Sequence, residues 1–344
     1  MKKQTIALLG AALLLVSSAE AQYKVLLPQC CSVPSSVFVL NAETGSLERA
    51  LAAATSTSFN VFALTAVPLR DGALAVLNDF PGTSSSTGTV SIVNPGTGAL
   101  LGSVALPGEP WTMALNPKSG VIYARFTLGA LYQIEELNPS TLQVIQQFTV
   151  TGGSSITVSP DGQRIYIPVF GTGVVVYSTS SLAQIGTVPG PDQVIGLSPD
   201  SKTLYAASDA LVAPSNSVYF VDTASLEITT IISLGNLGTL GGDSGGPGSG
   251  AVSADGTRLY INFGTSILTL DVTTRAKVDV PCPADDQGEQ VLAASNGSVY
   301  VRVQNGAANL AVVFDPAGAR FPRNFPCWGS AGWWPAQAVR SYSC

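Results

Sequence analysis

The feature that most constrains the fold is a short hairpin motif that recurs along the chain. Its clearest copy, Ser159-Pro-Asp-Gly-Gln-Arg-Ile-Tyr-Ile-Pro168, places an Asp-Gly turn between two apolar stretches. Glycine adopts positive φ without steric cost, so this pair favours a tight turn between antiparallel strands. Related copies lie at Pro68–Val76, Asn116–Arg125, Ser198–Ala207, Ser253–Asn262 and Ala294–Val303. The chain is therefore expected to consist of repeated β-hairpins.

A second motif repeats as regularly. It is an apolar strand that ends in Asn, Asp or Ser, followed by a short turn rich in Thr, Ser or Gly and by another strand. The strand ends are Asn41, Asn94, Asn138, Ser178, Asp222, Asp271 and Asp315. Copies spaced by about 40 to 50 residues are typical of a β-propeller with four-stranded blades. Seven copies predict an all-β, seven-bladed β-propeller.

Four strands are expected in each repeat, here called A to D from the axis outward. In the clearest repeat they are Ile156–Ser159, Ile165–Val169, Val174–Ser178 and Ala183–Val188. Neighbouring strands run antiparallel, so the A-to-B and C-to-D turns share one rim of the ring, the bottom rim. The B-to-C turns and D-to-A connections share the opposite rim, the top rim. The recurrent Asp161, Asp200 and Asp255 lie in A-to-B turns and are expected to form those turns.

The two ends of the chain look complementary. Tyr23–Leu27 resembles a strand B with no strand A before it, and Ala336–Ser341 resembles a strand A with no strand B after it. We expect these segments to pair, so that the N-terminal and C-terminal strands share one blade and close the ring. Closure removes the sheet edge that an open ring would expose.

The first 21 residues have the pattern of a signal peptide. Lys2-Lys3 forms a basic start, Ile6–Val16 is an apolar stretch too short to span a bilayer, and Ala19-Glu20-Ala21 fits a cleavage site. Residues 1–21 are therefore predicted to be removed, leaving 22–344 as a single propeller domain. Export to the periplasm or the extracellular space is expected, with no membrane span.

Three of the hairpin copies resemble the YVTN β-propeller repeat family. They are Ser159-Pro-Asp-Gly-Gln-Arg-Ile-Tyr-Ile167, Ser198-Pro-Asp-Ser-Lys-Thr-Leu-Tyr-Ala206 and Ser253-Ala-Asp-Gly-Thr-Arg-Leu-Tyr-Ile261. The resemblance implies a seven-bladed, often exported protein, and it covers nearly all of residues 22–344. The Tyr-Val-Thr-Asn string that names the family is absent. The family implies a fold and a location and no single activity, because propellers carry many unrelated functions.

The amino-acid composition argues against several classes of function and partner. The chain has no histidine and a formal net charge of -6. The negative charge argues against nucleic acid and anionic membranes as partners. Gly242–Pro247 matches the string around a trypsin-like nucleophile at Ser244, but that mechanism needs a histidine base. We interpret the segment as a glycine-rich connection. No cofactor motif is present, and no metal site is predicted.

Acidic and aromatic residues gather at the expected top rim. The acidic residues in or beside D-to-A connections are Glu109, Asp192, Asp243, Asp285, Asp286 and Glu289. They form either a site for a cation or cationic ligand or an ordinary solvated surface. The tryptophans near the same rim are Trp111, Trp328, Trp333 and Trp334. They form either a platform for sugars, peptides or aromatic ligands or wedges between blades. The candidate ligand-binding residues are the four tryptophans with Asp285, Asp286 and Glu289.

Four of the five cysteines are expected on the top rim near the ring closure. Cys30 and Cys31 lie in the B-to-C connection of the closure blade, and Cys282 and Cys327 lie in the last two D-to-A connections. Export permits disulfides. We predict a bond between Cys327 and either Cys30 or Cys31, with Cys282 available to the other member of the pair. Cys344 is expected near the opposite rim.

These patterns favour a non-catalytic binding or scaffold module whose partner is a protein, a glycan or a small ligand at the top rim. Two alternatives remain open. One is a lactonase-like hydrolase that uses carboxylates and arginines at the channel mouth, and the other is a cell-surface structural protein. The expected inner strands are almost uncharged, with Arg340 as an exception, which favours binding over catalysis. We expect a monomer.

Overall fold

The computed structural model describes residues 24–29, 36–41, 47–52, 62–80, 87–153, 155–208, 214, 216–234, 250–262, 266–281, 287–293, 299–305, 308–314 and 320–327. The secondary structure elements in these ranges are β-strands, paired in antiparallel register within each sheet. No helix in this part of the chain is long and apolar enough to cross a membrane.

The described strands form seven sheets, one with three strands and six with four. We number the sheets 1 to 7 along the chain. Sheet 1 contains β1 (Lys24–Gln29), β2 (Ser36–Asn41) and β3 (Leu47–Ala52). Sheet 2 contains β4 (Phe62–Pro68), β5 (Leu74–Phe80), β6 (Thr87–Val93) and β7 (Leu100–Ala105). Sheet 3 contains β8 (Glu109–Leu115), β9 (Ile122–Leu128), β10 (Leu131–Leu137) and β11 (Val144–Val150).

The remaining four sheets repeat the same plan. Sheet 4 contains β12 (Thr157–Val158), β13 (Arg164–Val169), β14 (Gly173–Ser178) and β15 (Gln184–Val188). Sheet 5 contains β16 (Gln193–Leu197), β17 (Thr203–Ser208), β18 (Ser217–Asp222) and β19 (Ile228–Ser233). Sheet 6 contains β20 (Gly250–Val252), β21 (Arg258–Asn262), β22 (Ser266–Asp271) and β23 (Lys277–Pro281). Sheet 7 contains β24 (Gln287–Ala293), β25 (Val299–Asn305), β26 (Ala308–Phe314) and β27 (Arg320–Cys327).

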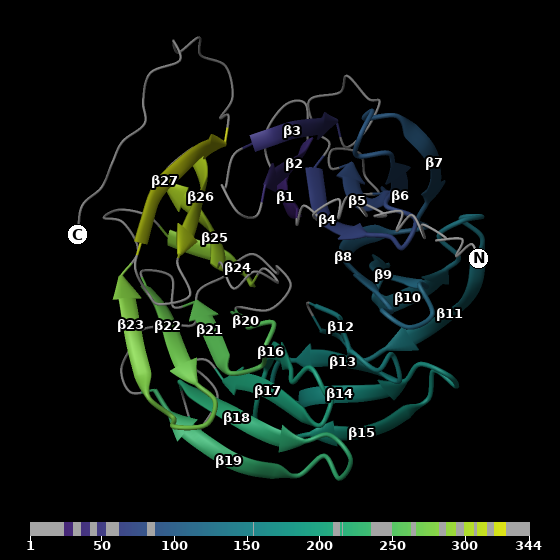
Figure 1. Cartoon of the computed structure of the whole chain (residues 1–344). Coiled ribbons are helices and arrows are strands. Elements are labelled where there is room, and N and C mark those ends of the chain that lie inside the picture. Colours follow the sequence, from purple (N-terminus) through teal and green to yellow (C-terminus); the bar gives the residue numbers. More distant parts are fainter. Residues whose placement is uncertain are drawn as a thin grey trace, which may run out of the picture.

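The sheets are arranged around a common centre (Figure 1). In each four-stranded sheet the first strand lies nearest the centre and the last lies outermost. Each sheet contacts the next one along the chain, from β1 against β4 through to β20 against β24. The strands of sheet 4 match the four strands expected for that repeat. The architecture is therefore β-propeller-like.

The core lies between successive sheets. Alternate residues of a strand point to opposite faces, so each sheet presents one apolar face to each neighbour. Leu77 of sheet 2 packs in a cluster with Phe126 of sheet 3, and Tyr166 of sheet 4 packs in one with Leu204 of sheet 5. Tyr166 and Tyr205 lie in such clusters, and Tyr260 is buried. A blade alone has two apolar faces, so stacking is what buries them.

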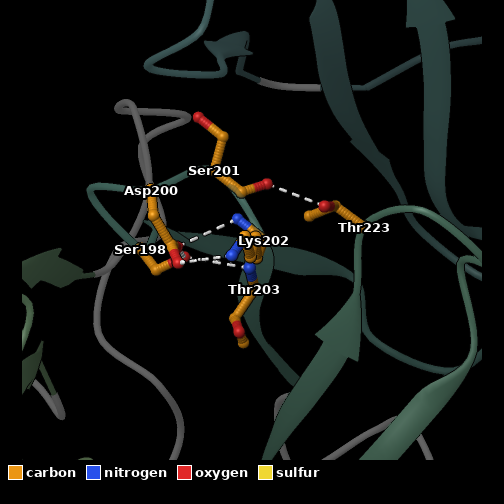
Figure 2. A network of polar contacts seen from close by, with 6 residues as sticks. All are labelled: Ser198, Asp200, Ser201, Lys202, Thr203 and Thr223. Carbon is orange, nitrogen blue, oxygen red and sulfur yellow. Dashed lines mark hydrogen bonds and ion pairs between the residues drawn. The ribbon is translucent and has the colours of Figure 1, made fainter.

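The recurrent Ser-x-Asp sequences build the A-to-B turns, which confirms the role predicted for their aspartates. In sheet 5 the Ser198 hydroxyl donates to Asp200 at 2.6 Å and accepts the backbone N–H of Thr203 at 2.9 Å (Figure 2). The backbone N–H of Lys202 donates to the same carboxylate at 3.1 Å. Equivalent bonds join Ser159 to Asp161 and Ser253 to Asp255. The aspartates are thus engaged by their own turns.

Neighbouring A-to-B turns also contact one another along the bottom rim. Nη2 of Arg70 in sheet 2 donates to the Pro117 carbonyl of sheet 3 at 2.8 Å. Nδ2 of Asn116 in sheet 3 donates to the Gly162 carbonyl of sheet 4 at 2.9 Å. The Asp161 N–H of sheet 4 donates to the Ser201 hydroxyl of sheet 5 at 2.9 Å. We call this series of contacts the turn belt.

The second sequence motif corresponds to the C-to-D turns on the same rim. In sheet 5, Oδ1 of Asp222 accepts the backbone N–H groups of Ala224 at 3.0 Å and Ser225 at 2.8 Å. The N–H of Leu226 donates to the Asp222 carbonyl at 2.8 Å, and Leu226 has a φ of +62°. The corresponding turns begin at Asn94, Asn138, Ser178 and Asp271. A short polar side chain is needed at the strand end because it satisfies the N–H groups of the turn.

Candidate functional site

Trp111 is the sequence-predicted ligand-binding residue whose side chain the structure describes. Glu289 lies in β24, and Cys327 ends β27, where it pairs with Asn309 of β26. The other predicted site residues lie outside the described ranges: Trp328, Trp333, Trp334, Asp285, Asp286, Cys30, Cys31 and Cys282. The tryptophan platform and the disulfide pairs that involve these residues stay predictions.

A β-bulge sets the position of Trp111. In the pairing of β8 with β9, Pro110 lies opposite Phe126 and Thr112 lies opposite Arg125, so Trp111 is an extra residue on β8. A bulge of this kind turns a side chain away from the regular alternation. The indole of Trp111 consequently lies over the guanidinium of Arg125, with its ring centre 5.5 Å from Cζ.

Arg125 is the largest fully buried side chain in the described residues, with 1% of its surface exposed. Its Cζ lies 4.9 Å from the ring centre of Tyr132 on β10, in addition to the contact with Trp111. Guanidinium groups are attracted to aromatic faces, and the attraction strengthens away from water. Trp111 is held in place by a hydrogen bond from its Nε1 to the Thr127 hydroxyl at 2.8 Å. Two aromatic rings thus enclose one cationic group.

The outer sides of both rings reach solvent. Trp111 and Tyr132 are each 38% exposed. Tyr123, two residues before Arg125, packs in the cluster between sheets 3 and 4, so Arg125 faces sheet 4. The position of Trp111 is therefore intermediate between the two predicted alternatives. Its ring contacts a buried group on one side and is open to solvent on the other.

Several buried polar atoms in this cluster have no hydrogen-bond partner. They are Nε and Nη1 of Arg125 and Oγ1 of Thr112. Thr112 has no exposed surface and lies directly opposite Arg125 in the strand register, on the same face. Buried polar groups are nearly always paired, so three unpaired atoms on one face call for an explanation.

Burial has the largest effect on the pKa of the Arg125 guanidinium and lowers it to about 10. The neighbouring Tyr132 raises this pKa. At neutral pH the group remains protonated, because its pKa still lies well above 7. The site therefore contains a buried positive charge.

The predicted acidic rim is only partly described. Glu109 begins β8 and is exposed, and Asp192 immediately precedes β16, where its N–H donates to the Ala207 carbonyl at 3.0 Å. Asp243 and the Asp285-Asp286 pair lie outside the described ranges. The acidic surface stays a prediction. The buried charge that the structure places at this rim is cationic.

Arg125, Thr112 and Tyr132 are additions to the sequence-predicted site. A signal for Arg125 exists in the repeats. Five repeats have a tyrosine in strand B, and sheet 2 has Val76 at the same position. Two residues later the chain has Asn78, Arg125, Pro168, Ala207, Asn262 and Arg302. An arginine at a position that is otherwise small or neutral marks sheets 3 and 7 as different. The sequence gives no indication that Arg125 contacts Trp111, because this contact depends on the β-bulge.

The fold and this rim define a β-propeller-like protein. In a comparison with solved structures the chain resembles hydrazine synthase from Kuenenia stuttgartiensis, a β-propeller-containing protein, with a TM-score of 0.56. The match covers 73% of this chain and 76% of the matched chain at 18% sequence identity, so it concerns the fold alone. No protein-family model matches the sequence. No curated protein matches it either.

Proposed function

We propose that the chain is an exported, non-catalytic binding module built as a closed seven-bladed β-propeller. The support for a binding role is the top-rim cluster of sheet 3. There two partly exposed aromatic rings, Trp111 and Tyr132, cover a buried Arg125 whose Nε and Nη1 have no partners. Exposed aromatic rings beside a few unsatisfied polar groups are typical of ligand-binding surfaces.

The proposed ring would be closed within sheet 1. Sheet 1 has three strands where the other six sheets have four, and β1 is its innermost described strand. The segment Ala336–Ser341 would supply the missing inner strand and pair with β1. A disulfide from Cys327 to Cys30 or Cys31 would join the same blade to its neighbour. Non-reducing peptide mapping tests this pairing, and a free Cys327 thiol would contradict it.

Binding is favoured over hydrolysis by the charge content of the inner strands. Among β4, β8, β12, β16, β20 and β24, the charged residues are Glu109 and Glu289. A lactonase-like site needs charged side chains that converge on the channel from several inner strands. Two carboxylates on two strands offer little for such chemistry. An exported location is supported by the signal-peptide pattern and would be checked by N-terminal sequencing of the secreted protein.

A binding screen tests the proposed function. The purified protein would be applied to immobilised glycans, peptides and small organic acids, alongside Trp111→Ala. We expect at least one class to be retained by the wild type and lost in the variant. The exposed Phe170 on the same rim of sheet 4 provides a matched control. Phe170→Ala should keep the binding. Equal binding by wild type and Trp111→Ala, or no binding to any class, would contradict the proposal.

A further inference from the structure

The strongest unexplained feature is the uncompensated charge of Arg125. The side chain is 1% exposed, and its Nε and Nη1 lack acceptors. No carboxylate among the described residues contributes to its pKa, which is shifted by burial and by Tyr132. A buried charge without a partner is strongly unfavourable, whereas a paired one is tolerated. Within the part of the chain that the structure describes, the guanidinium therefore has no partner anion.

We propose that Arg125 binds the carboxylate of a small organic acid at the top rim of sheet 3, between the rings of Trp111 and Tyr132. This inference rests on the proposed binding function and names the ligand class for that surface. The guanidinium would donate N–H groups to the carboxylate oxygens in charge-assisted hydrogen bonds, for which the planar donor fork of arginine is well suited. The apolar part of the acid would lie against the two aromatic rings.

Three observations favour a monoanionic carboxylate over phosphate or a polyanion. Among the described residues of sheets 3 and 4, Arg125 is the one cation near this rim, because Lys118 and Arg164 lie at the A-to-B turns of the opposite rim. The net charge of -6 repels polyanions at long range. The flanking surface is aromatic, which suits an acid with an apolar body.

The rings also define how the acid reaches the guanidinium. Arg125 is enclosed, so one ring must move when the ligand enters. Trp111 is 38% exposed and is held by one hydrogen bond, from Nε1 to Thr127. Displacement of the indole exposes the Arg125 donors at the bulge. Binding is consequently expected to change the fluorescence of Trp111.

Thermal unfolding with benzoate, acetate and inorganic phosphate tests the proposal. In the wild type we expect benzoate in the millimolar range to raise Tm, acetate to act less, and phosphate to have no effect. Arg125→Met should abolish the benzoate response. It should also raise Tm without ligand, because the buried unpaired charge is gone. Arg49→Met, which removes an exposed arginine on β3, is the matched control and should keep the full response.

Two further variants keep the test decisive if Arg125→Met does not fold. Arg125→Lys retains the charge but loses the planar donor fork, so benzoate should bind at least several-fold more weakly. Trp111→Phe should retain the benzoate-induced rise in Tm while losing the benzoate-dependent fluorescence change.

A benzoate response of wild-type size in Arg125→Met or Arg125→Lys would overturn the proposal, as would an equal response to phosphate or none to benzoate. If those results appear while Trp111→Ala still loses another ligand class, only the carboxylate assignment fails. If Trp111→Ala loses nothing, the proposed function fails as well.

Discussion

The top and bottom rims of the β-propeller-like fold satisfy their polar groups in different ways. On the bottom rim, the side chains of Ser198 and Asp200 form hydrogen bonds within their own turn, and the turn belt links sheets 2 to 5. On the top rim of sheet 3, Arg125 and Thr112 are more deeply buried than those turns, yet Nε and Nη1 of Arg125 and Oγ1 of Thr112 lack partners. The polar residues of the bottom rim recur from sheet to sheet, whereas the arginine of the top-rim cluster is replaced by a neutral residue in the adjacent sheets 2 and 4.

This difference helps to distinguish residues that stabilise the fold from residues that bind a ligand. A polar residue that recurs in several blades, such as Asp161 or Asp255, has the same local partners in each copy, so its role is structural. A charged residue that one blade carries and its neighbours replace with a neutral one has no such local explanation. Arg125 corresponds to Asn78 in sheet 2 and to Pro168 in sheet 4. Functional residues in a repeat protein are best sought where copies disagree.

Replacing one glycine at each rim of sheet 4 should cause the largest of the expected stability losses, at the bottom rim. Gly162 and Gly171 of sheet 4 both have a φ of +72°. A Cβ on Gly162 would lie 2.4 Å from Oδ1 of Asn116 in the turn belt, whereas one on Gly171 would meet nothing within 4 Å. Gly171→Ala should cost about 1 kcal/mol from backbone conformation alone. Gly162→Ala should cost about 3 kcal/mol because overpacking is added.

The free energy of unfolding in denaturant measures both values. Because the backbone strain is equal, the difference reports the contact between sheets 3 and 4 at the bottom rim. Equal losses for the two variants would mean that Asn116 moves aside without cost, and would contradict tight packing of the turn belt at Gly162.

Removing a hydroxyl group should lower the stability of the fold at the bottom rim and raise it at the top rim. Ser198→Ala deletes the acceptor of the Thr203 N–H and the donor to Asp200, and should destabilise the fold by about 1.5 kcal/mol. Thr112→Val removes a buried hydroxyl without a partner, and should stabilise the fold by about 1 kcal/mol. Chemical denaturation of the two variants against wild type checks both signs. A stability loss in Thr112→Val would show that this hydroxyl has a partner in solution.

Acid should weaken the bottom rim, and this is the smallest of the expected effects. Hydrogen bonds from the Ser225 N–H and hydroxyl lower the pKa of Asp222 in the folded state. A carboxyl with a lowered folded pKa stabilises the fold above its unfolded value of about 3.9 and loses this contribution as pH falls through the folded value. Asp222→Asn keeps the acceptor oxygen, so the variant should lose less stability as the pH falls below the unfolded value of about 3.9.

The matched control is the C-to-D turn of sheet 3, where Oδ1 of Asn138 accepts the equivalent N–H groups, those of Ser140 and Thr141. Asn138→Asp should make stability more sensitive to acid. Unfolding curves measured across the pH range compare the three proteins. Parallel pH dependences in all of them would contradict the assigned role of the Asp222 carboxylate.

Much of the fold could be predicted because its determinants are local. The turn residues Asp161 and Gly162, and the strand-end residue Asp222, act on backbone groups within a few positions of themselves. The strands of sheet 4 and the buried Tyr166 follow from the same repeat. Apolar alternation in each strand also predicts stacking, since both faces of a blade must be covered.

The site could be predicted less well because its geometry is not local. Trp111 was identifiable as an aromatic residue near a rim. Its contact with Arg125 depends on one extra residue in β8, and sequence spacing does not reveal where a bulge falls. Tyr132 joins the cluster only because β10 pairs with β9 so that Tyr132 lies opposite Thr127.

The sequence by itself determined the repeated four-stranded unit, its turn residues and the apolar faces that pack between sheets, because each depends on neighbours along the chain. Tertiary structure decided which side chains meet at a rim. It placed the indole of Trp111 and the ring of Tyr132 over the guanidinium of Arg125, and it left that charge buried. Burial and pairing are properties of a three-dimensional environment that strand pairing creates, and no single stretch of residues encodes them.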